Sequence, residues 1–115
     1  MQEIYQRLNT TPQELAAFCE KWQIVELALF GSILRDDFRY DGDDPSDIDL
    51  LYVSSPQARY GFTFLNMKEE LEELLGRKVD LISEVGIQSS RNWLRRKIIL
   101  ESKQVIYAKR SAVNH

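Results

Sequence analysis

The sequence predicts one α/β or α+β domain in which helices pack against a single sheet. Short apolar runs with strand character alternate along the chain with segments of helical periodicity. The length of 115 residues suits one domain with one core, and no internal repeat or linker interrupts it. We therefore expect residues 1–115 to form a single domain.

The first helix is predicted over about residues 12–22. Thr11 suits the N-cap, Pro12 the first helical position, and Glu14 completes a capping box. Apolar residues then follow at helical spacing: Leu15, Phe18, Cys19 and Trp22. Because Cys19 is the single cysteine and lies on this face, no internal disulfide can form and the thiol is expected to be buried.

The first strand is predicted over Ile24–Phe30, a short apolar run that ends at a Gly-Ser turn. Glu26 interrupts the run and is expected to face an edge. Ser32 can cap a short helix through Phe38. Turn-forming residues 40–46, YDGDDPS, predict a loop before the next strand.

The second strand is predicted over residues 47–53, ending at a Ser-Ser-Pro sequence. Apolar residues spaced three and four apart from Phe64 to Leu74 then predict an amphipathic helix over about residues 62–75. Gly76 is expected to end that helix.

The last three elements are predicted as strand, helix and strand. The strands are KVDLIS at residues 78–83 and QVIYA at residues 104–108. Between them, Ser89 or Ser90 can cap a helix through about Ser102. The residues expected to point inward from this region are Trp93, Leu94 and Ile98, with Trp93 and Tyr107 expected in the core.

Composition excludes several classes of function. No stretch approaches the ~20 apolar residues that a membrane span requires, and the N-terminus lacks a signal-peptide pattern, so a cytoplasmic location and no membrane partner are expected. The single histidine, His115, argues against a histidine base and against a His/Cys zinc site. The net charge of −3 argues against broad electrostatic capture of nucleic acid, so direct nucleic-acid binding is not expected.

Three aspartates lie where buried strands have no structural use for acids. Asp47 and Asp49 share one face of the second strand, with Cα atoms ~6.6 Å apart. Asp80 sits within the third predicted strand and can join them if that strand lies beside the second. Two such charges at ~5 Å repel by about 3 kcal/mol at an effective dielectric near ~20. Divalent cations remove the conflict, and Mg²⁺ prefers carboxylate oxygens together with phosphates.

The Gly31-Ser32 turn suits the same chemistry. Glycine permits close backbone approach, and a serine at a helix start offers a hydroxyl and exposed N–H groups to an anion. Arg35 follows about one helical turn later and can also face a phosphate. Together these residues predict a metal–nucleotide site.

A basic cluster near the C-terminus has two interpretations. Its members are Arg91, Arg95, Arg96, Lys97 and Lys103. They can form a solvated helix face, or they can contact a triphosphate or an acidic partner.

The combination FGS…SDIDLL…VDLI resembles the minimal nucleotidyltransferases of the polymerase-beta-like nucleotidyltransferase superfamily. The resemblance covers about residues 12–108, including ESKQVIYA as the last strand, and implies a mixed sheet of about four strands flanked by helices. One departure is the spacer between Ser32 and Asp47, fourteen residues that exceed the family's usual length. The surplus is expected in the YDGDDPS loop, where insertions cost little.

The resemblance also implies a mechanism. Asp47 and Asp49 would hold two Mg²⁺ ions, and Asp80 would ligate one of them and help to deprotonate the attacking hydroxyl. Gly31 and Ser32, assisted by Arg35, would hold the terminal phosphates of ATP. AMP would be transferred with loss of pyrophosphate.

The acceptor implied by the resemblance is a protein. Minimal nucleotidyltransferases of this kind act as antitoxins that transfer AMP to a tyrosine of a HEPN-family RNase toxin, and a hetero-oligomer with the toxin is expected. Two alternatives stay open: a binding antitoxin or subunit that needs no catalysis, and a stand-alone small-molecule adenylyltransferase.

Overall fold

The computed structural model describes residues 5–6, 8–34 and 47–109. The helices within these ranges are α2 (Pro12–Lys21), the 3-10 helix η1 (Gly31–Leu34), α3 (Thr63–Leu75), α4 (Glu84–Gln88) and α5 (Trp93–Ser102). The strands are β1 (Ile24–Phe30), β2 (Ile48–Ser54), β3 (Val79–Ser83) and β4 (Gln104–Ala108). All four predicted strands are confirmed, within one residue at each end.

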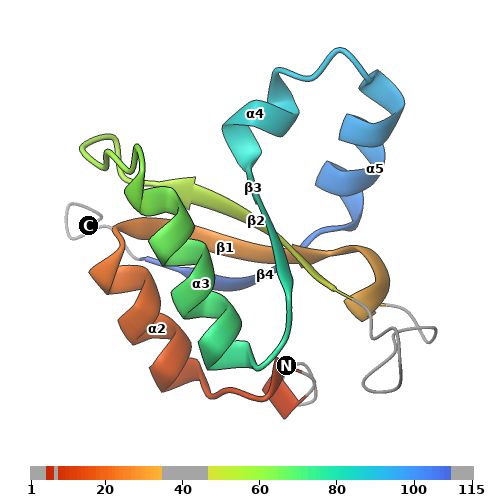
Figure 1. Cartoon of the computed structure of the whole chain (residues 1–115). Helices are drawn as coiled ribbons and strands as arrows, with labels where there is room; N and C mark the ends of the chain where they lie inside the picture. Colours follow the sequence, from red (N-terminus) through yellow and green to blue (C-terminus); the bar gives the residue numbers. More distant parts are fainter. Residues whose placement is uncertain (1–4, 7, 35–46, 110–115) are drawn as a thin grey trace, which may run out of the picture.

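The strands form one mixed sheet in the order β3-β2-β1-β4 (Figure 1). Strand β1 is antiparallel to both of its neighbours, whereas β2 and β3 are parallel. The predicted mixed sheet flanked by helices is therefore confirmed. The expectation that Glu26 faces an edge is wrong, because β1 is central and Glu26 lies between Val53 of β2 and Ala108 of β4.

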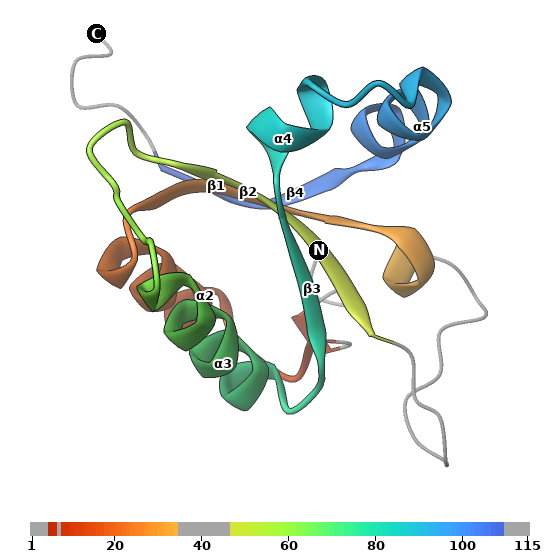
Figure 2. The same ribbon diagram turned by 45° about the horizontal axis from the view of Figure 1, so that its top comes forward.

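Helices cover both faces of the sheet: α2 and α3 lie on one face, and α4 and α5 on the other (Figure 2). Alternation along β2 directs Ile48 and Leu50 toward α2 and α3, and Leu51 toward α4 and α5. Most of the buried apolar side chains belong to the α2/α3 side. A smaller cluster on the other side consists of Ala28, Phe30, Leu51, Ile87 and Ile99.

The predicted N-cap of α2 and the predicted C-terminal end of α3 are confirmed. Thr11 caps α2, accepting the N–H of Glu14 at 3.2 Å, and Gly76 ends α3 in the left-handed region at φ 68°. Cys19 is fully buried, and this burial raises the pKa of its thiol to about 12. In the part of the chain that is described, no helix has the length and apolarity needed to cross a bilayer.

The region after β3 differs from the prediction. Instead of one helix capped by Ser89 or Ser90, the chain forms α4 directly after β3 and then α5, which Asn92 caps by accepting the N–H of Arg95 at 3.1 Å. The residues that α5 was expected to direct inward are exposed, by 63% for Trp93, 52% for Leu94 and 57% for Ile98. Ile99 is the buried residue of α5, and Tyr107 packs partly buried against the core as expected.

Lys103 links the α4/α5 layer to the central strand. Its ammonium group pairs with Glu84 at the start of α4 and lies 3.3 Å from Oε2 of Glu26 in β1. The Glu84 side chain is only 12% exposed. The hydrogen bond to Glu84 and the charges of both glutamates raise the pKa of Lys103 above its ordinary value, although partial burial opposes them.

Replacing Lys103 with methionine is expected to lower the free energy of unfolding by about 1–3 kcal/mol at pH 7, because a largely buried carboxylate loses its partner. The raised pKa favours the folded state at every pH below the ordinary lysine value of about 10.5. This contribution disappears as the pH rises through the folded pKa, so the difference between the variant and the wild type should narrow there. Urea titrations at several pH values measure this, with exposed Lys97→Met as a control expected within about 0.5 kcal/mol of wild type. A constant difference across the pH range would contradict the prediction.

Candidate functional site

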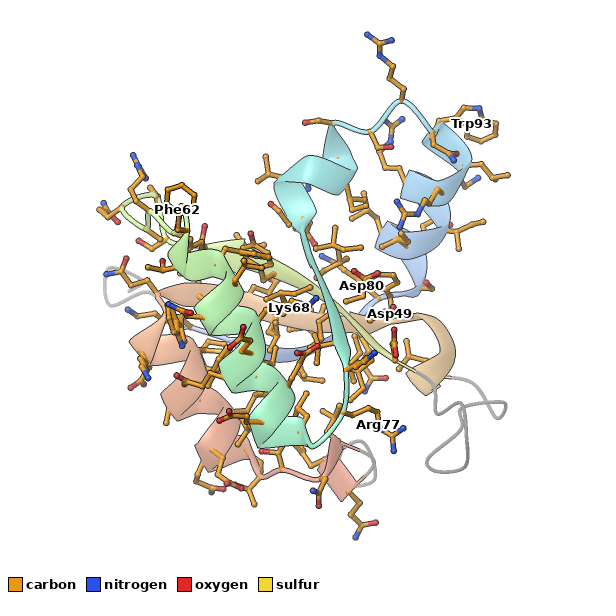
Figure 3. The ribbon with its side chains drawn as sticks, viewed as in Figure 1. Asp49, Phe62, Lys68, Arg77, Asp80 and Trp93 are labelled. Carbon is orange, nitrogen blue, oxygen red and sulfur yellow. The ribbon has the colours of Figure 1, made fainter. Side chains whose placement is uncertain are left out.

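Two of the three predicted aspartates lie next to each other on adjacent parallel strands. Asp49 of β2 and Asp80 of β3 are register partners, and paired strands lie ~4.8 Å apart. Figure 3 shows both near the beginning of their strands. Asp49 alternates with the buried Leu50 and so lies on the sheet face opposite α2 and α3. Such a pair of like charges is costly without a compensating cation.

The third aspartate lies just outside the strand. The first hydrogen bond between β2 and the segment before β3 runs from the N–H of Ile48 to the carbonyl of Lys78, at 3.0 Å. Asp47 precedes Ile48, and its side chain is exposed. Within residues 5–6, 8–34 and 47–109, no three acidic, histidine or cysteine side chains converge closely enough to hold one metal ion. The joint role of Asp47, Asp49 and Asp80 as metal ligands therefore stays a prediction.

The three aspartates have the ligand atoms that Mg²⁺ prefers, but the described structure does not bring all three together. Carboxylate oxygens are the protein ligands that this ion prefers, together with water and substrate phosphates. The register of Asp49 and Asp80 supplies two such groups side by side. The third, Asp47, is two residues from Asp49 along the chain, which is the spacing of side chains on one face of a strand.

Gly31 lies close to the side chain of Asp49. Phe30 at the end of β1 is the register partner of Asp49, which places the next residue beside the aspartate side chain. Gly31 has a φ of +79°, and a Cβ there would collide with Oδ2 of Asp49 and lie 3.2 Å from its Cγ. Both the backbone conformation and the space require glycine at this position.

The remaining predicted site residues are described only in part. Ser32 belongs to η1, so its backbone directly follows Gly31, but its side chain lies outside the described part of the structure. Arg35 and the 40–46 loop also lie outside the described residues. Their predicted roles in phosphate binding are untested.

Lys78 is a candidate that the sequence analysis missed. It stands two residues before Asp80, so strand alternation predicts both side chains on one face. The carbonyl of Lys78 accepts the N–H of Ile48, the residue between Asp47 and Asp49. The Lys78 side chain is exposed. The signal was present in KVDLIS as a lysine and an aspartate at strand spacing.

The predicted basic cluster does not act as one group. Lys103 pairs with Glu84 and Glu26, and the guanidinium of Arg96 donates to the carbonyl of Ser90 at 2.9 Å. Both therefore contribute to local structure. The cations that remain exposed are Arg91, Arg95 and Lys97.

Comparison with known proteins identifies the family to which this chain belongs. A family model described as a nucleotidyltransferase domain matches residues 13–106. The protein adenylyltransferase MntA of Thermococcus cleftensis is 32% identical over 89 residues, which are 77% of this chain and 82% of that protein. A solved structure assigned as a minimal nucleotidyltransferase is 27% identical, with a TM-score of 0.59 over 81% of this chain and 86% of that one.

The fold is also that of a more distant complex. A chain from the structure of tri-AMPylated Shewanella oneidensis HEPN toxin with MNT antitoxin has a TM-score of 0.55 at 15% identity. The match covers 85% of this chain and 70% of that one. At this identity the likeness concerns the fold alone.

Proposed function

We propose that this chain, which belongs to the nucleotidyltransferase domain family, is an antitoxin that transfers AMP from ATP to a hydroxyl group of a cognate HEPN-family RNase toxin and so neutralises it. The observation that carries the proposal is the carboxylate pair of Asp49 and Asp80, with Gly31 close to the carboxylate of Asp49. Phosphoryl chemistry gives two adjacent carboxylates a use, because they can hold the divalent cations that such reactions require.

The proposed ligands of Mg²⁺ are Asp47, Asp49 and Asp80. Two ions held there would, when bound, offset the negative charge of the triphosphate and orient its α-phosphate. Glycine at position 31 leaves the carboxylate of Asp49 the space that a Cβ would take. Asp80 is exposed and stands on β3 at the edge of the sheet, where it can accept the proton of an incoming acceptor hydroxyl.

The proposed phosphate contacts come from the segment after β1 and the start of β3. Backbone N–H groups of η1 and the hydroxyl of Ser32 would bind the terminal phosphates, assisted by Arg35. Lys78, on the same face as Asp80, can add a positive charge to the departing pyrophosphate. The hydroxyl oxygen attacks the α-phosphorus, the bond to the β-phosphate oxygen breaks, and pyrophosphate leaves with AMP bound to the acceptor.

The proposed acceptor is a tyrosine of the toxin. The relative from Thermococcus cleftensis is a protein adenylyltransferase by name, and the Shewanella oneidensis structure pairs an MNT antitoxin with an AMPylated HEPN toxin. Both support a protein acceptor for this chain.

The decisive experiment mixes the purified chain and its cognate toxin with Mg²⁺ and ATP labelled at either the α- or the γ-phosphate. We expect label on the toxin from α-labelled ATP only, loss of the signal with EDTA, and a tyrosine–AMP adduct by mass spectrometry. The toxin's RNase activity should fall in step with labelling. Label from γ-ATP would indicate a kinase, and neutralisation without any label would favour the binding antitoxin.

A further inference from the structure

The α4/α5 side of the molecule carries most of its exposed apolar surface. Seven large hydrophobic residues are exposed in the described ranges, and five of them lie on α4, α5 or β4. These five are Val85, Trp93, Leu94, Ile98 and Val105. A tryptophan that is 63% exposed on a helix is unusual for a monomer and indicates a contact surface.

Helix α5 has apolar side chains on two sides, and within the described residues only one side is buried. Ile99 and Leu100 pack against the sheet. At 100° per residue, Leu94 and Ile98 are neighbours at i and i+4 on the opposite side. Trp93, in the first turn, lies about 100° around the helix from Leu94 and is exposed as well. We call these three exposed side chains the outer ridge: Trp93, Leu94 and Ile98.

The charges around the outer ridge are mainly positive. Arg91, Arg95 and Lys97 are exposed beside it, while Glu101 is the single acid within α5. The whole chain has a net charge of −3, so this local excess of cations runs against the composition. A complementary surface would be apolar at its centre and edged with aspartate or glutamate.

The outer ridge lies on the side of the sheet that carries the candidate site. Helices α4 and α5 cover the face opposite α2 and α3, which is also the face of Asp49 and Asp80 (Figures 2 and 3). In Figure 3, Trp93 marks the end of α5 that is farther from the two aspartates. A protein bound along α5 would therefore extend across the same face as the carboxylates.

We propose that the outer ridge of α5, with its border of Arg91, Arg95 and Lys97, is the surface on which this chain holds its protein acceptor through an apolar patch edged with carboxylates. The inference rests on the proposed function for the identity of that acceptor, the cognate toxin. Contact through α5 would keep the acceptor on the side of the sheet where its hydroxyl can reach Asp49 and Asp80.

The test uses four variants of the full chain and the purified toxin. Trp93→Ser/Ile98→Ser removes two exposed side chains of the ridge. Phe62→Ser/Leu65→Ser removes a matched pair, 98% and 62% exposed, near the start of α3. Asp49→Asn changes the proposed reaction site and leaves the outer ridge unaltered. Binding to the toxin is measured by isothermal titration calorimetry, and transfer is measured with α-labelled ATP.

We expect the ridge variant to bind the toxin at least ~30-fold more weakly, as for a hot-spot aromatic residue. The α3 variant should bind like wild type, and Asp49→Asn should bind normally without transferring AMP. Arg95→Glu/Lys97→Glu should also weaken binding, with a smaller loss at high salt because screening removes the attraction. Unchanged melting temperatures would exclude unfolding as the cause.

Three results would overturn the inference. The first is a ridge variant that binds the toxin as tightly as wild type. The second is a ridge that instead controls self-association, seen by sedimentation of the chain alone, which would assign it to a second copy. The third is Trp93-dependent binding of a labelled single-stranded RNA with toxin binding unaffected. If Asp49→Asn still transferred AMP, the proposed chemistry would fail while the binding result for α5 would stand.

Discussion

Asp49→Asn and Asp80→Asn are each expected to reduce AMP transfer to the toxin on the order of 10³-fold or more, because each would remove the charge of a proposed Mg²⁺ ligand. Both substitutions are nearly isosteric. The contact between residue 49 and Gly31 is therefore kept, and the fold should be intact by circular dichroism. Transfer rates with α-labelled ATP at saturating Mg²⁺ measure the effect, and Glu73→Gln on the exposed side of α3 is the control.

The same variants distinguish a cation-binding role of the aspartates from a purely structural role. Like charges opposite one another on neighbouring strands destabilise a sheet, so Asp80→Asn should raise the free energy of unfolding by roughly 0.2–1 kcal/mol without Mg²⁺. Adding Mg²⁺ should stabilise the wild type more than the variant. Two results would contradict the assignment of these aspartates as Mg²⁺ ligands. One is a variant that keeps a tenth of the wild-type transfer rate, and the other is a wild-type melting temperature that does not change with Mg²⁺.

The carboxylate pair could be predicted in part because strand alternation is local. The sequence SDIDLL places Asp47 and Asp49 on one face wherever the strand lies. That Asp80 stands opposite Asp49 depends on a parallel pairing made across α3, and only the assembled sheet determines that register. The sequence supplied the residues, while the tertiary structure supplied their proximity.

The errors fall on apolar side chains that the described part of the chain leaves exposed. Trp93, Leu94 and Ile98 were assigned to the core because hydrophobic side chains are usually buried, yet α5 buries Ile99 instead. The helix start was also misplaced, because Asn92 and the two preceding serines are comparable caps and α4 is too short to show periodicity. Such errors coincide with the surface for which we infer a partner.

The position of Glu26 illustrates a different limit. An acid within an apolar run suggests an edge strand, and the sheet order shows the opposite. Its carboxylate is accommodated by Lys103, which is distant in sequence and reaches it from the end of α5. The sequence pattern around Glu26 does not show that Lys103, from a distant segment, will pair with its carboxylate.

Gly31→Ala is expected to reduce AMP transfer on the order of 10²-fold, because the new methyl group would collide with the carboxylate of Asp49 and displace it from the position in which it acts. The substitution also forces alanine into the left-handed region at φ +79°, which should cost about 1–2 kcal/mol of stability. Transfer assays and urea unfolding of the same preparations measure the two effects separately.

Gly61→Ala distinguishes displacement of Asp49 from simple backbone strain. Gly61 also has a positive φ, +50°, but nothing lies within 4 Å of a Cβ built there. Its substitution should therefore cost stability in the same way while leaving transfer within about twofold of wild type, since no side chain of the candidate site is displaced. Equal losses of transfer in the two variants would attribute the effect to strain alone. Normal transfer by Gly31→Ala would show that the close approach of Gly31 to Asp49 has no part in the reaction, and would remove Gly31 from the proposed site.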